Sequence, residues 1–337
     1  GFRVSGSDAH ESELTEHLAA AGAKVMYGQA AANITDDMDL VVYTAAVHAD
    51  NPEYAEVVRR GIPMMTRAEL LGQIMKNYGE AIAISGTHGK TTTTSMVTEI
   101  LLAAEKDPTI SVGGILHSIG GNIRVGGPEL FVTEACEYTN SFLSFFPTME
   151  IILNIEADHL DFFKDLDDIR HSFRLFAEKL DEKGLLIINR DIKNYEEISG
   201  GLPCRVVTFG HSSESDYSAA DITYDAFARP TFTLTEQGKK AGTITLGVPG
   251  EHNVYNALAA IATAKALGIP DTAIAEGLLH FTGTDRRFEK KGELNGITII
   301  DDYAHHPQEI AATLKAAHNY PHKKLWCVFQ PHTYTRT

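Results

Sequence analysis

The stretch ISGTHGKTTTTSM, residues 84–96, determines how the rest of this chain is interpreted. It follows a short apolar run and precedes a helix-forming segment, which is the setting of a phosphate-binding loop. Backbone N–H groups of such a turn, together with the positive end of the helix, hold phosphate oxygens. The common pattern has a glycine five residues before the glycine of GKT, where this chain has Ile84. We still predict ATP or GTP binding here, with an ordinary tight strand–helix turn as the alternative, and the predicted contacts are Gly86, Thr87, His88, Gly89, Lys90, Thr91 and Thr92.

Acidic and hydroxyl side chains near the loop suit a metal ion that accompanies a nucleotide. Lys90 would reach the outer phosphates, and the Thr91 hydroxyl would contact Mg²⁺. Glu134 ends an apolar strand in FVTEACEY, and acids at the carboxyl ends of such strands commonly face the nucleotide and hold metal. His159 lies in the acidic cluster NIEADHLD, residues 154–161. The alternatives are a solvated strand-end acid for Glu134 and a loop or capping role for His159.

The composition limits the kinds of partner. A chain of 337 residues with 43% hydrophobic residues fits two or three domains with packed cores. Its formal charge of −16 argues against a general nucleic-acid binder, and its longest apolar runs have the length of strands, not of membrane spans. Cys136, Cys204 and Cys327 are isolated, which indicates reduced thiols in the cytoplasm. The two chain ends suggest that the sequence is part of a longer protein.

Strand-like and helix-like segments alternate along the chain, and this predicts an α/β fold with parallel sheets. Up to residue 78 the predicted elements are strands at 2–8 and 39–46, the latter buried, and helices at 12–22 and 52–61. From residue 79 they are strands at 81–85, 130–136, 150–159 and 184–191 and helices at 90–104, 167–181, 253–268 and 271–281. Short β segments between 204 and 248 indicate a smaller antiparallel or edge sheet. After a polar hinge at 282–289, the sequence predicts the start of a third α/β domain that ends in a strand at 324–330.

Five motifs occur in one order and at large spacings: GTHGKTTTTSM, NIEADHLD, GEHNVYNALAA, DRRFE and DDYAHHPQE. Together they resemble the Mur ligase family, ATP-dependent amide-forming enzymes of peptidoglycan synthesis. The resemblance covers essentially the whole chain and implies three domains. These are a truncated Rossmann-like UDP-sugar-binding domain at 1–78, a central ATP-binding domain at 79–281, and the start of a truncated Rossmann-like amino-acid-binding domain at 282–337. The central domain is expected to have a parallel sheet and a smaller antiparallel sheet.

The resemblance also implies a reaction. In members of the family, ATP phosphorylates a substrate carboxylate, and an incoming amine attacks the resulting acyl phosphate to give an amide. The tract VVYTAAVHADNPE, the doubled histidine of DDYAHHP and the ending QPHTYTRT are most similar to the alanine-adding branch. The expected substrates are therefore UDP-N-acetylmuramate and L-alanine, with ATP and Mg²⁺ as cofactors, in the cytoplasm. We expect no nucleic-acid partner and no membrane insertion.

By resemblance, the family's functional roles fall on matching residues of this chain. The expected catalytic residues are Lys90, Glu134, His159 and Arg286, and the expected metal ligands are Thr91, Glu134 and His159. Further nucleotide contacts are expected from Asn253, Asn256, Arg287 and Asp302, and substrate contacts from Asp8, His305, His306, His332 and Arg336. Each group has a simpler alternative: helix caps for Asn253 and Asp8, a solvated hinge for the arginines, and a helix-start turn for the paired histidines.

The chain departs from the family pattern in three places. No glycine-rich loop precedes the strand at 2–8, Cys136 takes a position where an acid is expected, and Phe173 stands near the position where several relatives carry a carbamylated lysine. Two alternative functions stay open. One is the recycling ligase that attaches a whole tripeptide to the same sugar, and the other is a nucleotide-binding relative that has lost ligation. A simple phosphate-loop kinase would leave the DDYAHHP motif unexplained.

Overall fold

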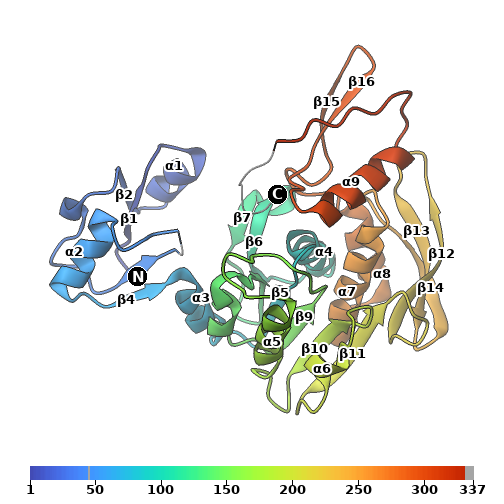
Figure 1. Cartoon of the computed structure of the whole chain (residues 1–337), viewed down its shortest axis with the longest axis horizontal. Helices are drawn as coiled ribbons and strands as arrows, with labels where there is room; N and C mark the ends of the chain where they lie inside the picture. Colours follow the sequence, from blue (N-terminus) through green and yellow to red (C-terminus); the bar gives the residue numbers. More distant parts are fainter. Residues whose placement is uncertain (45, 331–337) are drawn as a thin grey trace. The chain divides into compact units, whose positions relative to one another are not determined.

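The computed structural model describes residues 1–44 and 46–330, and these residues divide into two compact units between Gly72 and Gln73. In the first unit β1 pairs in parallel with β2, and β3 pairs in parallel with β4 (Figure 1). The elements of this unit are β1 (Ser5–Asp8), α1 (Glu13–Ala20), β2 (Lys24–Tyr27), the short 3-10 helix η1 (Ala31–Asn33), β3 (Val41–Tyr43), α2 (Pro52–Arg60) and β4 (Met64–Thr66), and α3 (Arg67–Met75) crosses the division.

The first unit shows where local signals predict structure well and where they fail. The predicted helix at 52–61 forms as α2, because the Asn51 side chain accepts hydrogen bonds from the backbone N–H groups that follow it and Gly61 ends the helix at φ +67°. The prediction of a buried strand at 39–46 is wrong in its burial, since Val42 is 40% exposed. Within the described residues β3 has one partner strand, so its side chains lack the cover that a central strand receives.

The second unit is built on one sheet of ten strands in the order β14-β13-β12-β11-β10-β9-β5-β8-β6-β7. Its central strands are parallel, and β5 lies between β8 and β9. The first seven strands of this sheet in chain order, including the edge strand β7, are β5 (Glu80–Ser85), β6 (Thr109–Leu116), β7 (Gly121–Arg124), β8 (Leu130–Ala135), β9 (Met149–Ile152), β10 (Leu185–Asn189) and β11 (Arg205–Gly210). The sheet continues into the antiparallel strands β12 (Tyr217–Tyr224), β13 (Pro230–Glu236) and β14 (Lys239–Thr245). The antiparallel part joins the parallel part through only two residue pairs, between Phe209–Gly210 and Tyr217–Ser218.

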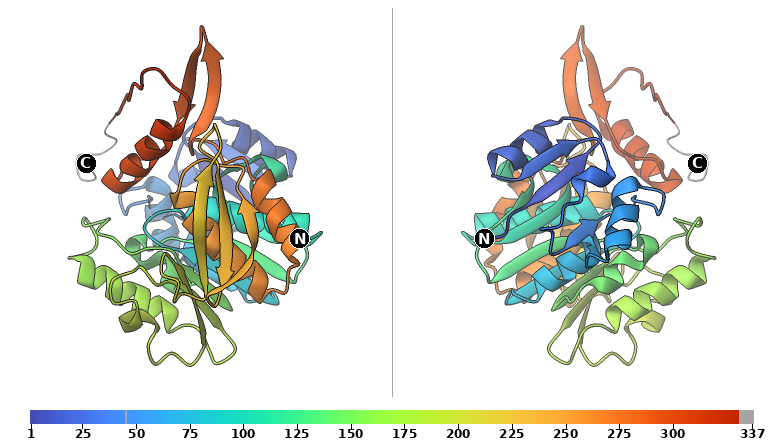
Figure 2. Two further views of the ribbon diagram at one scale, coloured as in Figure 1. Left: turned by 90° about the vertical axis from the view of Figure 1, so that its right-hand side faces the viewer. Right: turned by 90° about the vertical axis from the view of Figure 1, so that its left-hand side faces the viewer.

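Three helices cover one face of this sheet: α4 (Lys90–Ala103), α7 (His252–Ala266) and α8 (Asp271–His280). Ile82 and Ile84 of β5 are fully buried in the cluster that also contains Met96 and Ile100 of α4. Figure 2 shows the yellow strands β12–β14 beside the orange helices α7 and α8. Burial of apolar side chains is the main stabilising contribution to this unit. The packing of β5 side chains against α4 side chains holds the end of β5 next to the start of α4.

A second apolar group involves α5 (Leu166–Ala177) and η3 (Tyr138–Ser144), a 3-10 segment after β8. The rings of Phe142 and Phe176 stack with centroids 4.4 Å apart, and Phe173 meets Phe142 edge-on at 5.3 Å. All three are fully buried. Offset and edge-on ring pairs add to the burial of their area, so this cluster anchors the segment that leads away from β8. The remaining short elements of the unit are η2 (His117–Ile119) and α6 (Glu196–Ser199).

The carboxyl ends of the parallel strands meet at one edge of the sheet, which is where open α/β sheets bind ligands. The residues directly after β5, β8 and β9 therefore lie near one another, although they are far apart in sequence. The predicted strand at 150–159 ends as β9 at Ile152, which leaves residues 153–159 free to form a loop at this edge.

Beyond residue 282 the described chain forms β15 (Glu289–Leu294), antiparallel to β16 (Ile297–Asp301), and then α9 (Pro307–Asn319). The predicted strand at 324–330 is wrong, because these residues are described and pair with no strand of the described chain. Apolar alternation predicts a strand only where a partner supplies the ladder hydrogen bonds. Of the helices in residues 1–44 and 46–330, none has the length and apolar character that a membrane crossing requires.

Candidate active site

The phosphate loop lies between β5 and α4 and depends on two glycines. Gly86 has φ +138° and Gly89 has φ +83°, in the region that side chains rarely adopt. A Cβ on Gly86 would lie 3.0 Å from the Leu153 Cβ, and one on Gly89 would lie 2.5 Å from the Asn256 Oδ1. Ile84 is fully buried in β5, so the loop starts at Gly86. The short form of the loop is therefore a complete strand–loop–helix turn.

Asn154, which follows β9, holds the loop in shape. Its Oδ1 accepts a hydrogen bond from the His88 backbone N–H at 2.8 Å, and its Nδ2 donates to the His88 carbonyl at 3.0 Å. The Thr87 hydroxyl accepts from the Glu156 backbone N–H at 2.9 Å. Satisfying these polar groups inside the protein leaves the loop pre-organised for an anion.

Lys90 is the cation of the loop. Its ammonium donates to the Gly86 carbonyl at 2.5 Å and to the carboxylate of Glu137 at 3.0 Å. Burial by itself would lower the pKa of Lys90, but the Glu137 carboxylate outweighs it and the pKa is raised above its ordinary value. Lys90 is therefore charged at neutral pH, and its ammonium is held against the backbone of the loop.

Two of the three predicted metal ligands, Thr91 and Glu134, pack against consecutive glycines of β6. The Gly113 N–H donates to the Glu134 carboxylate at 2.5 Å, and a Cβ on Gly114 would lie 3.2 Å from the Thr91 Cγ2. Thr91 is buried and Glu134 is half-buried at the end of β8. Thr91 of α4 and Glu134 of β8 offer a hydroxyl and a carboxylate, and both donors suit a hard cation such as Mg²⁺.

His159 lies on the other side of Lys90. Its Nε2 is 3.9 Å from a Glu137 carboxylate oxygen and 3.8 Å from one of Asp158, and its ring lies against that of Tyr138, with centroids 4.6 Å apart and an interplanar angle of 30°. The Glu137 carboxylate therefore lies between the imidazole of His159 and the ammonium of Lys90. The arrangement offers a second group of oxygen and nitrogen donors beside the phosphate loop.

A pocket of about 300 Å³ opens next to the loop. It contains seven of the predicted nucleotide contacts, namely His88, Gly89, Thr92, Asn253, Asn256, Arg287 and Asp302. Asn253 is not the cap of α7: its Nδ2 donates to the Pro249 carbonyl, and its Oδ1 accepts from the Asn256 side chain at 3.0 Å. One wall of the pocket includes the adjacent rings of His211 and Tyr255, with centroids 3.7 Å apart and an interplanar angle of 31°, and these rings offer aromatic surface to a base.

The two adjacent arginines have different surroundings. Arg287 lines the pocket and lies 3.8 Å from the Glu309 carboxylate, whereas Arg286 is half-exposed and faces Asp301 at 3.6 Å. His306 caps α9 by accepting from the Gln308 backbone N–H, so the simpler reading of that residue as a helix-start turn describes part of its role. His306 also lies against the phosphate loop, with its ring centroid 4.6 Å from that of His88.

The remaining predicted substrate contacts are less informative. Asp8 lies in the first unit, where its carboxylate accepts from the His10 backbone N–H. His332 and Arg336 lie outside the described residues.

Three family models match successive parts of the chain: Mur ligase family, catalytic domain, over residues 1–79; Mur ligase middle domain over 84–264; and Mur ligase, glutamate ligase domain, over 286–336. The middle-domain match alone covers more than half of the chain. The chain belongs to the Mur ligase family. Members of this family use ATP.

Individual Mur ligases are also similar to the chain. A UDP-N-acetylmuramate–L-alanine ligase of Lachnospira eligens is 65% identical over 338 residues, which cover 100% of this chain and 74% of the relative. The crystal structure of UDP-N-acetylmuramate–alanine ligase from Thermotoga maritima has a TM-score of 0.81 at 33% identity, over 94% of this chain and 72% of that one. A UDP-N-acetylmuramate:L-alanyl-γ-D-glutamyl-meso-diaminopimelate ligase from Neisseria meningitides has a TM-score of 0.76 at 27% identity, over 85% and 92%. The predicted family and fold class are confirmed.

Four residues that contact the Mur ligase phosphate loop were not among the predicted site residues. Asn154 holds the loop, Glu137 is the counterion of Lys90, and Glu156 and Glu309 pair with His88 at 3.2 and 3.3 Å. Asn154 and Glu309 both lie within quoted family motifs, so their motif membership was a usable signal. Glu137 had no such signal, because a lone acid after a strand does not reveal which cation it faces.

Proposed function

We infer that this chain is the ATP-dependent ligase that joins L-alanine to the carboxylate of UDP-N-acetylmuramate. The observation that carries the inference is the pre-organised loop around Lys90, within a chain 65% identical to a ligase of that name. In the reaction, a carboxylate oxygen of the sugar attacks the γ-phosphorus of ATP and the bond to ADP breaks. The alanine nitrogen then attacks the acyl carbon, inorganic phosphate leaves, and the nitrogen loses its proton.

The residues around the loop supply positioning and charge rather than covalent chemistry. The Lys90 ammonium stabilises the transferring phosphoryl group, and the backbone of residues 86–92 holds the adjacent phosphates. Asn253, Asn256, Arg287 and Asp302 bind the remainder of ATP in the pocket. Arg286 acts at the reacting phosphate in this proposal, and Asp8, His305, His306, His332 and Arg336 contact the other substrates.

Mg²⁺ is part of the proposal. Thr91, Glu134 and His159 would hold it, and bound Mg²⁺ supplies neutralisation of phosphate charge. The packing of Gly113 and Gly114 against two of these residues supports the assignment, because a Cβ on Gly113 would lie 2.9 Å from the Glu134 carboxylate and would displace this oxygen donor. We further propose that residues 1–78, 79–281 and 282–337 belong to the UDP-sugar, ATP and amino-acid domains, and that the reaction occurs in the cytoplasm.

The deciding experiment follows ADP release and amide product with the full-length protein. It compares UDP-N-acetylmuramate plus L-alanine with the same sugar plus the tripeptide L-alanyl-γ-D-glutamyl-meso-diaminopimelate. Amide formation with alanine alone is the expected result. Product with the tripeptide but not with alanine would replace our inference with the recycling ligase, for which the 27% identical relative is the supporting observation. ATP binding without product in either mixture would indicate a relative that has lost ligation.

A further inference from the structure

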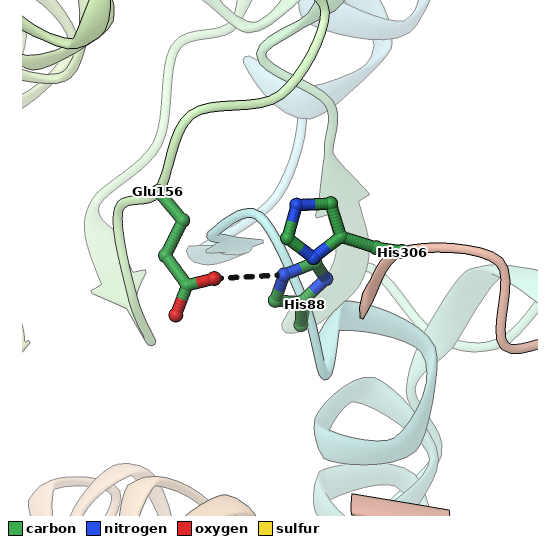
Figure 3. A group of neighbouring side chains, drawn as sticks. All are labelled: His88, Glu156 and His306. Carbon is green, nitrogen blue, oxygen red and sulfur yellow. Dashed lines mark hydrogen bonds and ion pairs between the residues drawn. The ribbon is translucent and has the colours of Figure 1, made fainter. Parts of the chain in front are cut away.

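Three side chains from separate parts of the second unit meet beside the phosphate loop: His88, Glu156 and His306. Each offers one ligand atom, and these atoms all lie within 4.8 Å of one another (Figure 3). His88 comes from the phosphate loop, Glu156 from the loop after β9, and His306 from the turn before α9. Figure 3 shows the Glu156 carboxylate pointing at the ring of His88, with the ring of His306 lying next to it. None of the three belongs to the Mg²⁺ ligands proposed above.

The distances between the ligand atoms of His88, Glu156 and His306 suit a small ion with tetrahedral coordination. Zinc lies about 2.0–2.2 Å from nitrogen and oxygen ligands, which places neighbouring donors of a tetrahedral site about 3.3–3.5 Å apart. The His88 Nε2 and the Glu156 Oε2 are already 3.2 Å apart. The rings of His88 and His306 have centroids 4.6 Å apart with an interplanar angle of 41°, so a small movement of the His306 ring completes the set.

Glu309 fixes the orientation of the His88 ring. Carboxylates that lie behind metal-binding imidazoles have the same role in known metal sites. Its carboxylate lies 3.3 Å from the His88 Nδ1, on the side of the ring opposite Glu156. A proton held on Nδ1 leaves Nε2 as the donor atom toward the cluster. Glu309 is itself fixed, because it accepts from the backbone N–H of His305 and pairs with Arg287.

We propose that His88, Glu156 and His306 form a binding site for a divalent transition-metal ion of borderline softness, and that this ion is Zn²⁺ in the first place. Two imidazoles and one carboxylate are a donor set that suits Zn²⁺, whereas Mg²⁺ prefers oxygen donors. The bound ion ties the phosphate loop to the turn before α9. Because His88 and Glu156 line the nucleotide pocket, occupancy of the site restrains the loop that grips ATP.

The test is a Zn²⁺ titration of the full-length, chelator-treated protein by calorimetry in excess Mg²⁺, repeated with Co²⁺ to read ligand geometry from its visible absorption. We expect one equivalent of tight Zn²⁺ and a tetrahedral Co²⁺ spectrum. His306→Ala and Glu156→Gln should abolish both signals, and Glu309→Gln should weaken binding about 10–100-fold, as loss of an outer carboxylate does. Metal-free melting curves check that each variant folds.

Three matched histidine variants make the assignment specific. His171→Ala removes an exposed histidine of α5, His159→Ala removes the proposed Mg²⁺ ligand, and His305→Ala removes the neighbour of His306. All three should retain the Zn²⁺ equivalent. Unchanged Zn²⁺ binding in both His306→Ala and Glu156→Gln, or loss of it in His159→Ala, would overturn the proposal, as would absence of binding to the unaltered protein.

Discussion

The ammonium of Lys90 and the carboxylate of Glu137 form a largely buried ion pair 3.0 Å long, although 47 residues separate them in sequence. Only 3% of the Glu137 side chain is exposed, so this carboxylate depends on Lys90 for its compensation. An arriving phosphate competes with Glu137 for the same ammonium. We therefore expect the pair to have two roles, one in the stability of the loop and one in the proposed binding of ATP.

The first prediction separates these two roles. Lys90→Met should abolish ADP formation and lower the free energy of unfolding by about 3 kcal/mol, because it strands a buried charge. The double variant Lys90→Met/Glu137→Gln should regain most of that stability while staying inactive. Thermal melts and ADP release measure the two effects. Wild-type turnover in Lys90→Met would refute the catalytic role of the lysine.

The second prediction concerns the glycine at the start of α4. Gly89→Ala should abolish ATP binding, because the new Cβ would meet the Asn256 Oδ1 at 2.5 Å in a backbone with φ +83°. Gly120→Ala is the matched control: its φ is also positive, at +67°, but nothing lies within 4 Å of the new Cβ. The control should lose only about 1–2 kcal/mol of stability from left-handed strain. Equal ATP affinity in the two variants, measured by calorimetry, would argue against a steric role for Gly89.

The sequence predicted the strand, loop and helix around residues 84–96 well because the signals for this turn are local. Its strand, two glycines and helix are consecutive, and each is specified by residues within a few positions. Motif membership marks Asn154 as a candidate, but the sequence does not show which groups Asn154 and Glu137 contact, since those contacts depend on which strands lie next to β5.

The errors of strand prediction have the same origin. Residues 324–330 and the strand that contains Val42 have the apolar character of strands. Strand formation and burial depend on partners from elsewhere in the chain, and an isolated segment carries no information about them. Within the described residues, 324–330 has no partner and β3 has one.

The third prediction concerns Glu150 of β9, which is fully buried and has no hydrogen-bond partner for either carboxylate oxygen among the described residues. Burial raises its pKa well above the ordinary value of 4.5. The folded protein therefore keeps the carboxyl protonated, while the unfolded chain ionises it above pH 4.5. Stability should fall as the pH rises from that value toward the raised folded pKa.

Glu150→Met should remove this penalty and raise the free energy of unfolding at neutral pH by about 1–3 kcal/mol, the cost of an unsatisfied buried group. The gain should grow with pH from about 4.5 upward. Glu182→Met, at an exposed position, is the control and should change little. Denaturant unfolding at several pH values measures both variants. A gain that is the same at all these pH values would mean that Glu150 does not titrate as its burial implies.

The fourth prediction distinguishes the adjacent arginines. Arg287 lines the nucleotide pocket beside Asp302, while Arg286 is half-exposed against Asp301. Arg287→Ala should therefore weaken ATP binding in a binding assay without UDP-N-acetylmuramate, by about tenfold or more, as expected for loss of a charge-assisted hydrogen bond.

Arg286→Ala should leave that affinity nearly unchanged, because its ion pair with Asp301 lies outside the pocket and is solvent-screened. If Arg286 contributes to catalysis as proposed, the loss should appear in kcat rather than in ATP affinity, since an interaction made only in the transition state lowers kcat and kcat/KM together. Calorimetric ATP affinities and steady-state ADP release with both substrates separate the two effects. Weaker ATP binding in Arg286→Ala than in Arg287→Ala would exchange the roles of the two arginines.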